Sequence, residues 1–365
     1  MNKKNIPWWK TVLGQEEIEV VRKSILNRNI TQGIITKDFE NQLAGLLGVP
    51  YLVLVNSGSS ALLAALIACG IGPGDEVIVP GFTFIATVQA PLILGAKVRL
   101  VDVKPNRPVI DENSIEAAVN SKTKAIIPVH LNGRAANLKK INKIAKKYKI
   151  SVIEDAVQAL CSKCKGEFLG TQSDIGVFSL GVTKFITAVQ GGFLVTRKKD
   201  IFNKLQKIKN HGCLSLEGGV LKCETLGFNF KFNDLFAGIG LKQLEKVKDK
   251  IKSFQNIYSF YKKELVSVSC MDLVEVKQGE GELPLWIEVI SKKREKVLRL
   301  LKQKRVEAKP FHKSIGEISY IKNRKKLKYS QFYAKKGLIL PSGPDQKNKD
   351  LKYVIKAIKE IEKDL

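Results

Sequence analysis

The first two thirds of the chain alternate between short apolar runs and longer stretches with apolar residues at helical spacing. Each apolar run is bounded by turn residues and has the length of a buried β-strand. The predicted strands are 51–55, 76–80, 96–103, 124–130 and 151–155. Helical patterns separate them, at 61–70, 81–95, 114–119 and 136–149. This alternation predicts a parallel sheet with helices on both faces, in which ligands bind at the carboxyl ends of the strands.

The two ends of the chain follow other patterns. Two amphipathic helices are expected in the first fifty residues, at 15–28 and 38–48. Beyond about residue 270, the predicted order is strand, helix, strand and terminal helix, at 284–290, 292–304, 306–311 and 350–365. We therefore expect an α/β protein with a large, mostly parallel domain at 1–245 and a smaller α+β domain at 246–365. The segment 213–226 is expected to be irregular.

Charge and composition narrow the classes of function. The formal net charge is +27, which favours polyanions or phosphorylated small molecules as partners. The lysines are spread along the chain without a zinc finger or interleaved aromatic residues, so no nucleic-acid partner is expected. The N-terminus lacks an apolar signal core and the uncharged run 77–96 contains proline and glycine, which predicts a cytoplasmic protein without a membrane partner. The CxxC of Cys161 and Cys164 has no second metal-ligating pair, which predicts incidental thiols and no metal site.

Lys184 is the only charged residue between Ile175 and Thr196. Burial of an unpaired ammonium among apolar residues is costly, so this environment favours the neutral amine. A neutral lysine amine is a nucleophile toward carbonyl groups. The alternative is a lysine at a strand end whose amine reaches solvent.

Three further positions carry candidate chemistry. The turn NSGSS, with Gly58, Ser59 and Ser60, lies between a strand and a helix, where backbone N–H groups bind phosphate. Phe84 follows the next strand and offers a face for stacking, and Asp155 ends a later strand. The alternatives are an ordinary serine N-cap, a core phenylalanine and an acid at a helix start.

Together these features match the needs of one cofactor. Pyridoxal 5′-phosphate requires an anchor for its phosphate, a face on which its ring stacks, a carboxylate that keeps its ring nitrogen protonated and a lysine that holds it covalently. The turn, the aromatic residue, the acid and the lysine occur in this order along the chain.

The sequence resembles the DegT/DnrJ/EryC1/StrS family of pyridoxal-phosphate sugar aminotransferases. The resemblance extends over nearly the whole chain, through TQGIITKDFE, NSGSSAL, PGFTFIAT, IEDAVQAL, DIGVFSLGVTK, the QGG turn and GFNFKFNDLFAGIG. It implies a fold type I enzyme and a homodimer with shared active sites. The implied roles are phosphate binding for Gly58, Ser59, Ser60 and Ser179, ring stacking for Phe84, pairing with the ring nitrogen for Asp155, contact with the ring hydroxyl for Gln158, the covalent link for Lys184 and contact with the partner subunit's cofactor for Asn229.

The resemblance also implies a reaction. L-glutamate would donate the amino group and a nucleotide-linked ketosugar, expected to be a 4-keto-6-deoxyhexose, would accept it at C4 for polysaccharide or glycoconjugate biosynthesis. A dehydratase branch of the family has histidine in place of the lysine, so Lys184 argues against that branch. The chain departs from the family pattern on the substrate side, at Asn132, Leu180-Gly181, Gln190 and Lys231.

Two alternative functions remain open. In the first, the amino group is transferred to a 3-keto sugar, a cyclitol or another ketone without a nucleotide. Alternatively, the protein is a non-catalytic regulator that binds pyridoxal phosphate and engages nucleic acid through its basic surface.

Overall fold

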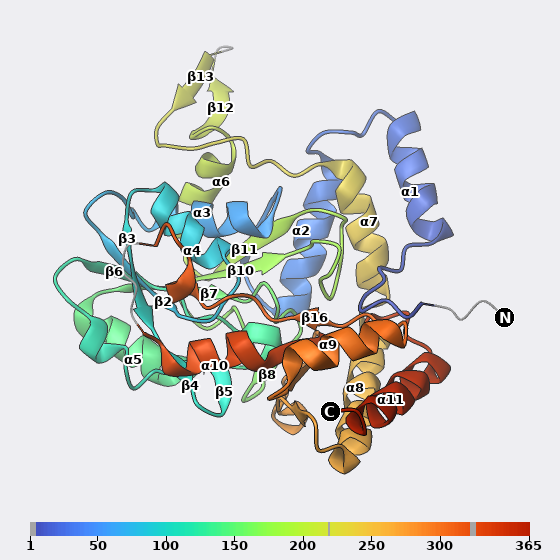
Figure 1. Cartoon of the computed structure of the whole chain (residues 1–365). Helices are drawn as coiled ribbons and strands as arrows, with labels where there is room; N and C mark the ends of the chain where they lie inside the picture. The colour runs from blue at the N-terminus through green and yellow to red at the C-terminus, as the bar shows by residue number, and fades with distance from the viewer. Residues whose placement is uncertain (1–4, 218–219, 322–325) are drawn as a thin grey trace.

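The computed structural model describes residues 5–217, 220–321 and 326–365, and its centre is a seven-stranded sheet (Figure 1). The strand order is β1-β11-β10-β7-β6-β2-β3. All neighbouring pairs from β10 to β3 are parallel, and β11 runs antiparallel to both β1 and β10. The strands are β1 (Tyr51–Val55), β2 (Glu76–Pro80), β3 (Lys97–Val101), β6 (Thr123–Ile126), β7 (Ser151–Asp155), β10 (Ile175–Ser179) and β11 (Gly192–Thr196). The mostly parallel α/β sheet expected from the sequence is confirmed.

Helices cover both faces of this sheet, which is why strands such as β1, β10 and β11 are apolar along most of their length. Alternate residues of one strand face opposite ways: in β1, Val53 packs with α3, α4 and α6, whereas Leu54 packs with α2 and α7. Further along the second face, β6 and β7 pack on α5. The helices are α1 (Gln15–Leu26), α2 (Ile34–Leu47), α3 (Gly58–Ala68), α4 (Ala86–Ile93), α5 (Leu138–Tyr148), α6 (Lys199–Lys209) and α7 (Asp234–Glu245).

Some elements differ from the predicted ones. The expected helix 114–119 is only a 3₁₀ turn, Glu116–Ala118, and the run 96–103 is divided between β3 and β4. Short antiparallel pairs flank the sheet: β4 (Val103–Lys104) with β5 (Arg107–Ile110), and β8 (Lys163–Cys164) with β9 (Glu167–Phe168).

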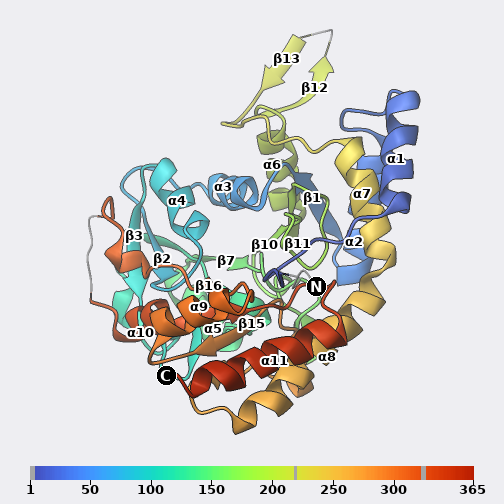
Figure 2. The same ribbon diagram turned by 45° about the vertical axis from the view of Figure 1, so that its right-hand side comes forward.

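The prediction of an irregular segment at 213–226 is wrong. β12 (Cys213–Glu217) and β13 (Val220–Cys223) form an antiparallel hairpin there. Apolar and polar residues alternate only over LSLE and LKC, as in a strand with one solvated face, but these runs are short and their pairing is local. The hairpin stands away from the body of the protein beyond α6 (Figure 2).

The C-terminal part has an antiparallel sheet of its own, in the order β14-β15-β17-β16. Its strands are β14 (Asp272–Leu273), β15 (Ile287–Ile290), β16 (Lys309–Pro310) and β17 (Gly337–Leu340). Its helices are α8 (Val247–Glu264), α9 (Arg294–Gln303), α10 (Lys328–Lys336) and α11 (Asn348–Glu362). A separate apolar core joins this sheet to α8, α9 and α11.

The N-terminal segment crosses to this C-terminal part. Ile6 pairs with Val306 in a parallel bridge and belongs to the same apolar core. The expected domain boundary at residue 245 falls between α7 and α8, and the division itself stays a prediction. Across the described residues, no helix is both long and apolar enough to cross a membrane.

Candidate active site

Lys184 lies in the turn between β10 and β11, at the carboxyl end of the parallel strands. Its backbone N–H donates to Gly181 O at 3.0 Å, which fixes the turn. Burial removes the amine from bulk water, and this desolvation lowers the pKa of Lys184 to about 8. The negative charge of Asp155 acts in the opposite direction and offsets part of the shift. A lysine in this state exchanges its proton near neutral pH, as a base or nucleophile must.

Asp155 ends β7 and is almost fully buried. Thr87 Oγ1 donates to its Oδ2 at 2.8 Å and the Val157 N–H donates to its Oδ1 at 3.2 Å. Burial raises the pKa of Asp155, although these hydrogen bonds and the charge of Lys184 oppose the shift. Among the described side chains, none forms an ion pair with Asp155. A buried carboxylate without a cationic partner fits a ligand that brings a protonated nitrogen.

The turn between β1 and α3 has the geometry of an anion site. Ser57 is the N-cap of α3, and its Oγ accepts from the Ser60 N–H at 3.0 Å and lies 2.8 Å from Ser60 Oγ. The preceding N–H groups of the helix face outward. A Cβ on Gly58 would lie 3.0 Å from the Ser179 Cβ, so glycine lets the end of β10 approach the turn. The structure thus brings together Gly58, Ser60 and Ser179, while Ser59 is exposed on the same turn.

Phe84 lies between β2 and α4 and is 45% exposed, so its ring is not core packing. His312 meets it edge to face, with ring centroids 5.3 Å apart. Burial lowers the pKa of His312, and the positive charge of Lys184 acts in the same direction. One face of the phenyl ring is therefore available to a flat ligand near the amine.

Gln158 and Asn132 form a buried polar connection. Asn132 N–H donates to Gln158 Oε1 at 2.9 Å, and Asn132 Oδ1 accepts from the N–H groups of Leu285 and Trp286 at 2.9 and 2.7 Å. Asn132 Nδ2 donates to Trp286 O at 2.9 Å. Through these bonds the Asn132 side chain ties the turn Leu131–Gly133 to the segment before β15, and its expected place on the substrate side stays a prediction.

Trp286 is a member of the site that sequence reasoning missed. The Lys184 Nζ lies over its indole, 5.4 Å from the ring centroid. Within the part of the chain that is described, the buried Trp286 Nε1 has no hydrogen-bond partner. Trp8 packs on the same indole at 6.3 Å, and Trp9 Nε1 donates to Val182 O in the lysine turn at 3.2 Å. Ser57, Thr87 and His312 were missed as well, although Ser57 lies in the NSGSS turn and Thr87 ends PGFTFIAT; no motif marks His312.

Asn229 lies apart from Lys184 on the surface. It is exposed, pairs with Asn210 in an antiparallel bridge, and its carbonyl accepts from Asn56 Nδ2 at 3.2 Å. Asn56 directly precedes the N-cap of α3, so Asn229 flanks the anion turn. Its predicted contact with a partner subunit stays a prediction.

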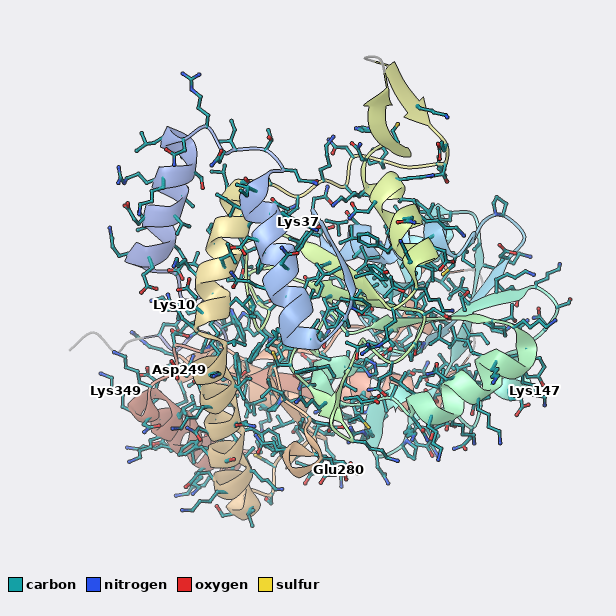
Figure 3. The ribbon with its side chains drawn as sticks, turned by 180° about the vertical axis from the view of Figure 1, so that it is seen from behind. Lys10, Lys37, Lys147, Asp249, Glu280 and Lys349 are labelled. Atoms are coloured by element: carbon teal, nitrogen blue, oxygen red, sulfur yellow. The ribbon has the colours of Figure 1, made fainter. Side chains whose placement is uncertain are left out.

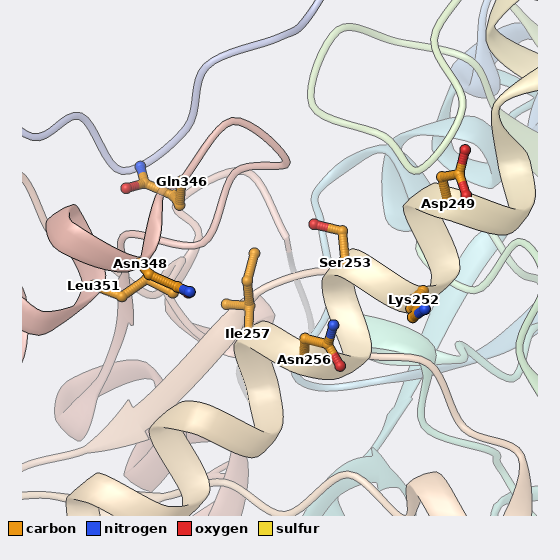
Figure 4. Close-up of a pocket in the computed structure, with 8 residues that line it drawn as sticks. All are labelled: Asp249, Lys252, Ser253, Asn256, Ile257, Gln346, Asn348 and Leu351. Carbon is orange, nitrogen blue, oxygen red and sulfur yellow. The ribbon is translucent and has the colours of Figure 1, made fainter.

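A separate hollow of about 340 Å³ lies between α8 and the start of α11 (Figure 4). Its lining residues are Asp249, Lys252, Ser253, Asn256, Ile257, Gln346, Asn348 and Leu351. None of the candidate residues above contributes to it, and it opens to solvent between polar side chains. We therefore place the active site at the strand ends around Lys184.

The model of the DegT/DnrJ/EryC1/StrS aminotransferase family matches residues 11–359. The chain is 32% identical over 369 residues to a GDP-perosamine synthase of Escherichia coli O157:H7, covering 99% of this chain and 100% of that protein. It is also 32% identical over 268 residues to a UDP-4-amino-4,6-dideoxy-N-acetyl-beta-L-altrosamine transaminase of Campylobacter jejuni, covering 73% of this chain and 71% of that protein.

Solved structures share the fold. Helicobacter pylori PseC, an aminotransferase involved in the biosynthesis of pseudoaminic acid, has a TM-score of 0.93 at 22% identity, over 99% of this chain and 100% of that one. The PLP form of a putative sugar aminotransferase from Streptococcus pneumoniae also has a TM-score of 0.93 at 22% identity, over 99% of both chains.

Proposed function

This chain belongs to the DegT/DnrJ/EryC1/StrS aminotransferase family, and from that membership we propose that it transfers an amino group to a nucleotide-linked keto-deoxysugar with pyridoxal 5′-phosphate as cofactor. One observation carries the proposal: a lysine with a pKa lowered to about 8 lies near a buried carboxylate at the carboxyl ends of a parallel sheet. Neither group is needed there for packing, and both are needed for amino transfer.

The residues around Lys184 fit the cofactor. Ser60, Ser179 and the free N–H groups at the start of α3 would hold the phosphate, with Gly58 admitting it close to the backbone. Phe84 would stack on the ring and Gln158 would contact its hydroxyl. Bound there, the cofactor supplies an electron sink for amine chemistry.

Two side chains of this protein, Asp155 and Lys184, would hold and transfer the protons of the reaction. Asp155 would hold a proton on the ring nitrogen, because an anionic carboxylate in a desolvated site favours the protonated form of its partner. The Lys184 Nζ, once free, would accept a proton from the donor's α-carbon and return it to the carbon on the other side of the transferred nitrogen. Trp286 and the N-terminal tryptophans close this side of the amine from water.

Two features support a nucleotide-linked acceptor. The relatives are named for GDP- and UDP-linked sugars, and the net charge of +27 attracts a diphosphate. We propose a 4-keto-6-deoxyhexose aminated at C4, with L-glutamate as donor. Lys37 on α2, Lys147 on α5 and Lys349 on α11 lie far apart from one another, so these lysines do not form one compact basic patch, which speaks against a nucleic-acid-binding regulator (Figure 3).

The acceptor is tested with the aminated cofactor form of the enzyme. It is mixed with nucleotide-linked 4-keto-6-deoxyhexoses, nucleotide-linked 3-keto sugars and free cyclitol ketones, and return of the aldehyde form of the cofactor is followed by absorbance. We expect the fastest return with a 4-keto nucleotide sugar. If only the free ketones restored the aldehyde form of the cofactor, the proposal of a nucleotide-linked acceptor would be rejected.

We further propose that the protein is a homodimer with shared sites. Large apolar side chains on α1, on α2 and in the segment that leads away from the hairpin are exposed: Leu26, Ile34, Leu226 and Phe228 at 66%, 77%, 71% and 66%. A second copy of the chain would cover them. Asn229 lies beside Phe228 and would then face the partner's cofactor phosphate.

Subunit mixing tests the shared site. Lys184→Ala and Asn229→Ala chains are each expected to be inactive alone, and mixing them is expected to restore up to about a quarter of the parental activity, because half of the dimers are hybrids with one intact site of two. Mixing each variant with itself is the control. Exchange proven by mass spectrometry without recovered activity would contradict shared sites.

Phe84→Ala is expected to weaken binding of pyridoxal phosphate about fivefold, because a ring stack is worth about 1 kcal/mol. Phe332→Ala is the matched control, since Phe332 is 43% exposed but lies on α10. Fluorescence titration of the cofactor-free protein measures both affinities. Equal affinities for the two variants would remove Phe84 from the cofactor site.

The pKa of Lys184 sets a pH dependence. Only the neutral amine reacts with the cofactor aldehyde, so capture of pyridoxal phosphate by the cofactor-free protein should accelerate as pH rises through the pKa of about 8. From pH 7 to pH 8 the neutral fraction, and hence the rate, should rise about fivefold, levelling off above about pH 9. Stopped-flow absorbance measures this rate. A rate that still climbs tenfold per pH unit beyond pH 9 would show an ordinary lysine.

A further inference from the structure

Two cysteines face each other at the base of the β12–β13 hairpin. Cys213 begins β12, Cys223 ends β13, and they are register partners in the antiparallel pair. Directly opposed residues of such a pair project to the same side of the ribbon. Both thiols are free. The hairpin extends from the body of the protein, so its base is the point where its two arms leave the fold (Figures 1 and 2).

The backbone hydrogen bonds show which type of antiparallel residue pair Cys213 and Cys223 form. The Glu224 N–H donates to Gly212 O at 3.0 Å, which places Gly212 opposite Glu224 and makes Cys213–Cys223 a non-hydrogen-bonded pair. Such pairs have the shorter Cα separation, about 4.5 Å, which lies within the range of roughly 4.4–6.8 Å that a disulfide spans. Cys213 Sγ donates to His211 O at 3.6 Å, and the neighbouring Cys223 thiol raises the pKa of Cys213. Cys223 is exposed, so a reagent in solution can reach the pair.

Among the described strand pairs, no other cysteine lies opposite a second cysteine. Burial raises the pKa of Cys69 to about 11, of Cys161 to about 12 and of Cys270 to about 11, which suppresses their thiolates. Cys164 lies opposite Glu167 in the β8–β9 pair. In the described residues no cluster of three or more histidine, cysteine or acidic side chains offers a metal site, so the hairpin pair is not half of one.

We propose that Cys213 and Cys223 are a redox-sensitive thiol pair, which a low-molecular-weight disulfide such as glutathione disulfide converts into a disulfide across the base of the hairpin. The Cys223 thiolate attacks the reagent, forming a mixed disulfide and releasing one glutathione. The Cys213 thiolate then attacks the Cys223 sulfur and releases the second. Together the two cysteines lose two electrons and two protons, and the two released glutathione molecules gain them as thiols.

This disulfide would act as a clamp that holds together the two arms of the hairpin, β12 and β13, the second of which leads to Asn229. Below the cysteines the arms are packed backbone to backbone: a Cβ on Gly212 would lie 1.8 Å from Thr225 O, and the His211 N–H donates to Phe228 O at 3.1 Å. The arms then meet in the Asn210–Asn229 bridge. An effect on amino transfer through Asn229 rests on the proposed function, whereas formation of the disulfide does not.

Peptide mapping tests the disulfide. The full-length protein loaded with pyridoxal phosphate is incubated with excess glutathione disulfide, alkylated and digested with trypsin without reduction. Lys222 separates the cysteines, so cleavage at Lys209, Lys222 and Lys231 places them in peptides 210–222 and 223–231. We expect these peptides to appear as one linked species, lighter than their sum by two hydrogen atoms and separated by reduction.

Other products would overturn the proposal. They are a stable glutathione adduct on Cys223, a link between Cys161 and Cys164, or a cross-link between two copies of Cys223. The variant Cys223→Ser removes an exposed thiol without disturbing the core and should give no linked peptides, whereas Cys164→Ser should give them as the parent does.

Native proteolysis measures the clamp independently of activity. Trypsin cuts at Lys222 only when the arms separate, so oxidation should slow this cut about tenfold in the parent. It should leave the rate unchanged in Cys223→Ser. Equal rates for oxidised and reduced parent protein would refute the clamp. If the linked peptides form but amino transfer never occurs in either state, the proposed function fails and the thiol pair stands.

Discussion

Lys184→Ala is expected to lower kcat by at least about a thousandfold, because the variant loses both the covalent attachment of the cofactor and the base that moves the proton. The structure supports this size of effect. The amine is the desolvated lysine nearest Asp155, and its lowered pKa of about 8 keeps it reactive near neutral pH. Steady-state assays with glutamate and the preferred ketosugar measure the loss.

Lys250→Ala is the matched control for Lys184→Ala. Burial also lowers the pKa of Lys250 to about 8, but its Nζ lies 3.5 Å from Phe185 O on the outer side of the same turn. Its removal is expected to leave kcat within about threefold of the parent, because no ligand contact is lost. If both variants lost activity equally, the effect would come from the turn as a whole and not from the amine of Lys184.

Asp155→Asn is expected to retain the cofactor but lower kcat at least about a hundredfold. The amide has the size of the carboxylate but lacks the negative charge that keeps the ring nitrogen protonated, whereas the phosphate contacts remain. Cofactor content by absorbance and kcat by steady-state assay separate these two effects.

Thr87→Val serves as the graded comparison for Asp155→Asn. It removes the 2.8 Å hydrogen bond to Asp155 Oδ2 but keeps the negative charge of the carboxylate. A loss of roughly tenfold or less is expected. Activity of Asp155→Asn within a few-fold of the parent would exclude this carboxylate as the partner of the ring nitrogen.

The fold could be predicted because its strands are buried on both faces. Runs such as YLVLV and EVIVP consist mainly of apolar residues and are bounded by turns that contain glycine, so local sequence was sufficient to predict them. The β12–β13 hairpin was missed because only its two short arms pair with each other, and no second layer imposes an apolar run. Short alternating segments are ambiguous without knowledge of their partner strand.

The site was partly predictable for a similar reason. Lys184, Asp155 and the serine turn stand out because each breaks or ends an apolar run. Trp286 reads as an ordinary strand aromatic, and only tertiary packing places it over the lysine from about one hundred residues away. Asn132 is a similar case, since its contacts with Leu285 and Trp286, about 150 residues further along the chain, cannot be read from the sequence.

The most direct test of the account is to locate the covalent link to the cofactor. The protein loaded with pyridoxal phosphate is reduced with borohydride and digested with trypsin. Trypsin does not cut after a modified lysine. If the cofactor is linked to Lys184, we therefore expect a single labelled peptide spanning residues 166–197, uncut at Lys184 and labelled on that residue. A label on any other lysine, Lys250 included, or a normal cut at Lys184 in fully loaded protein, would contradict it.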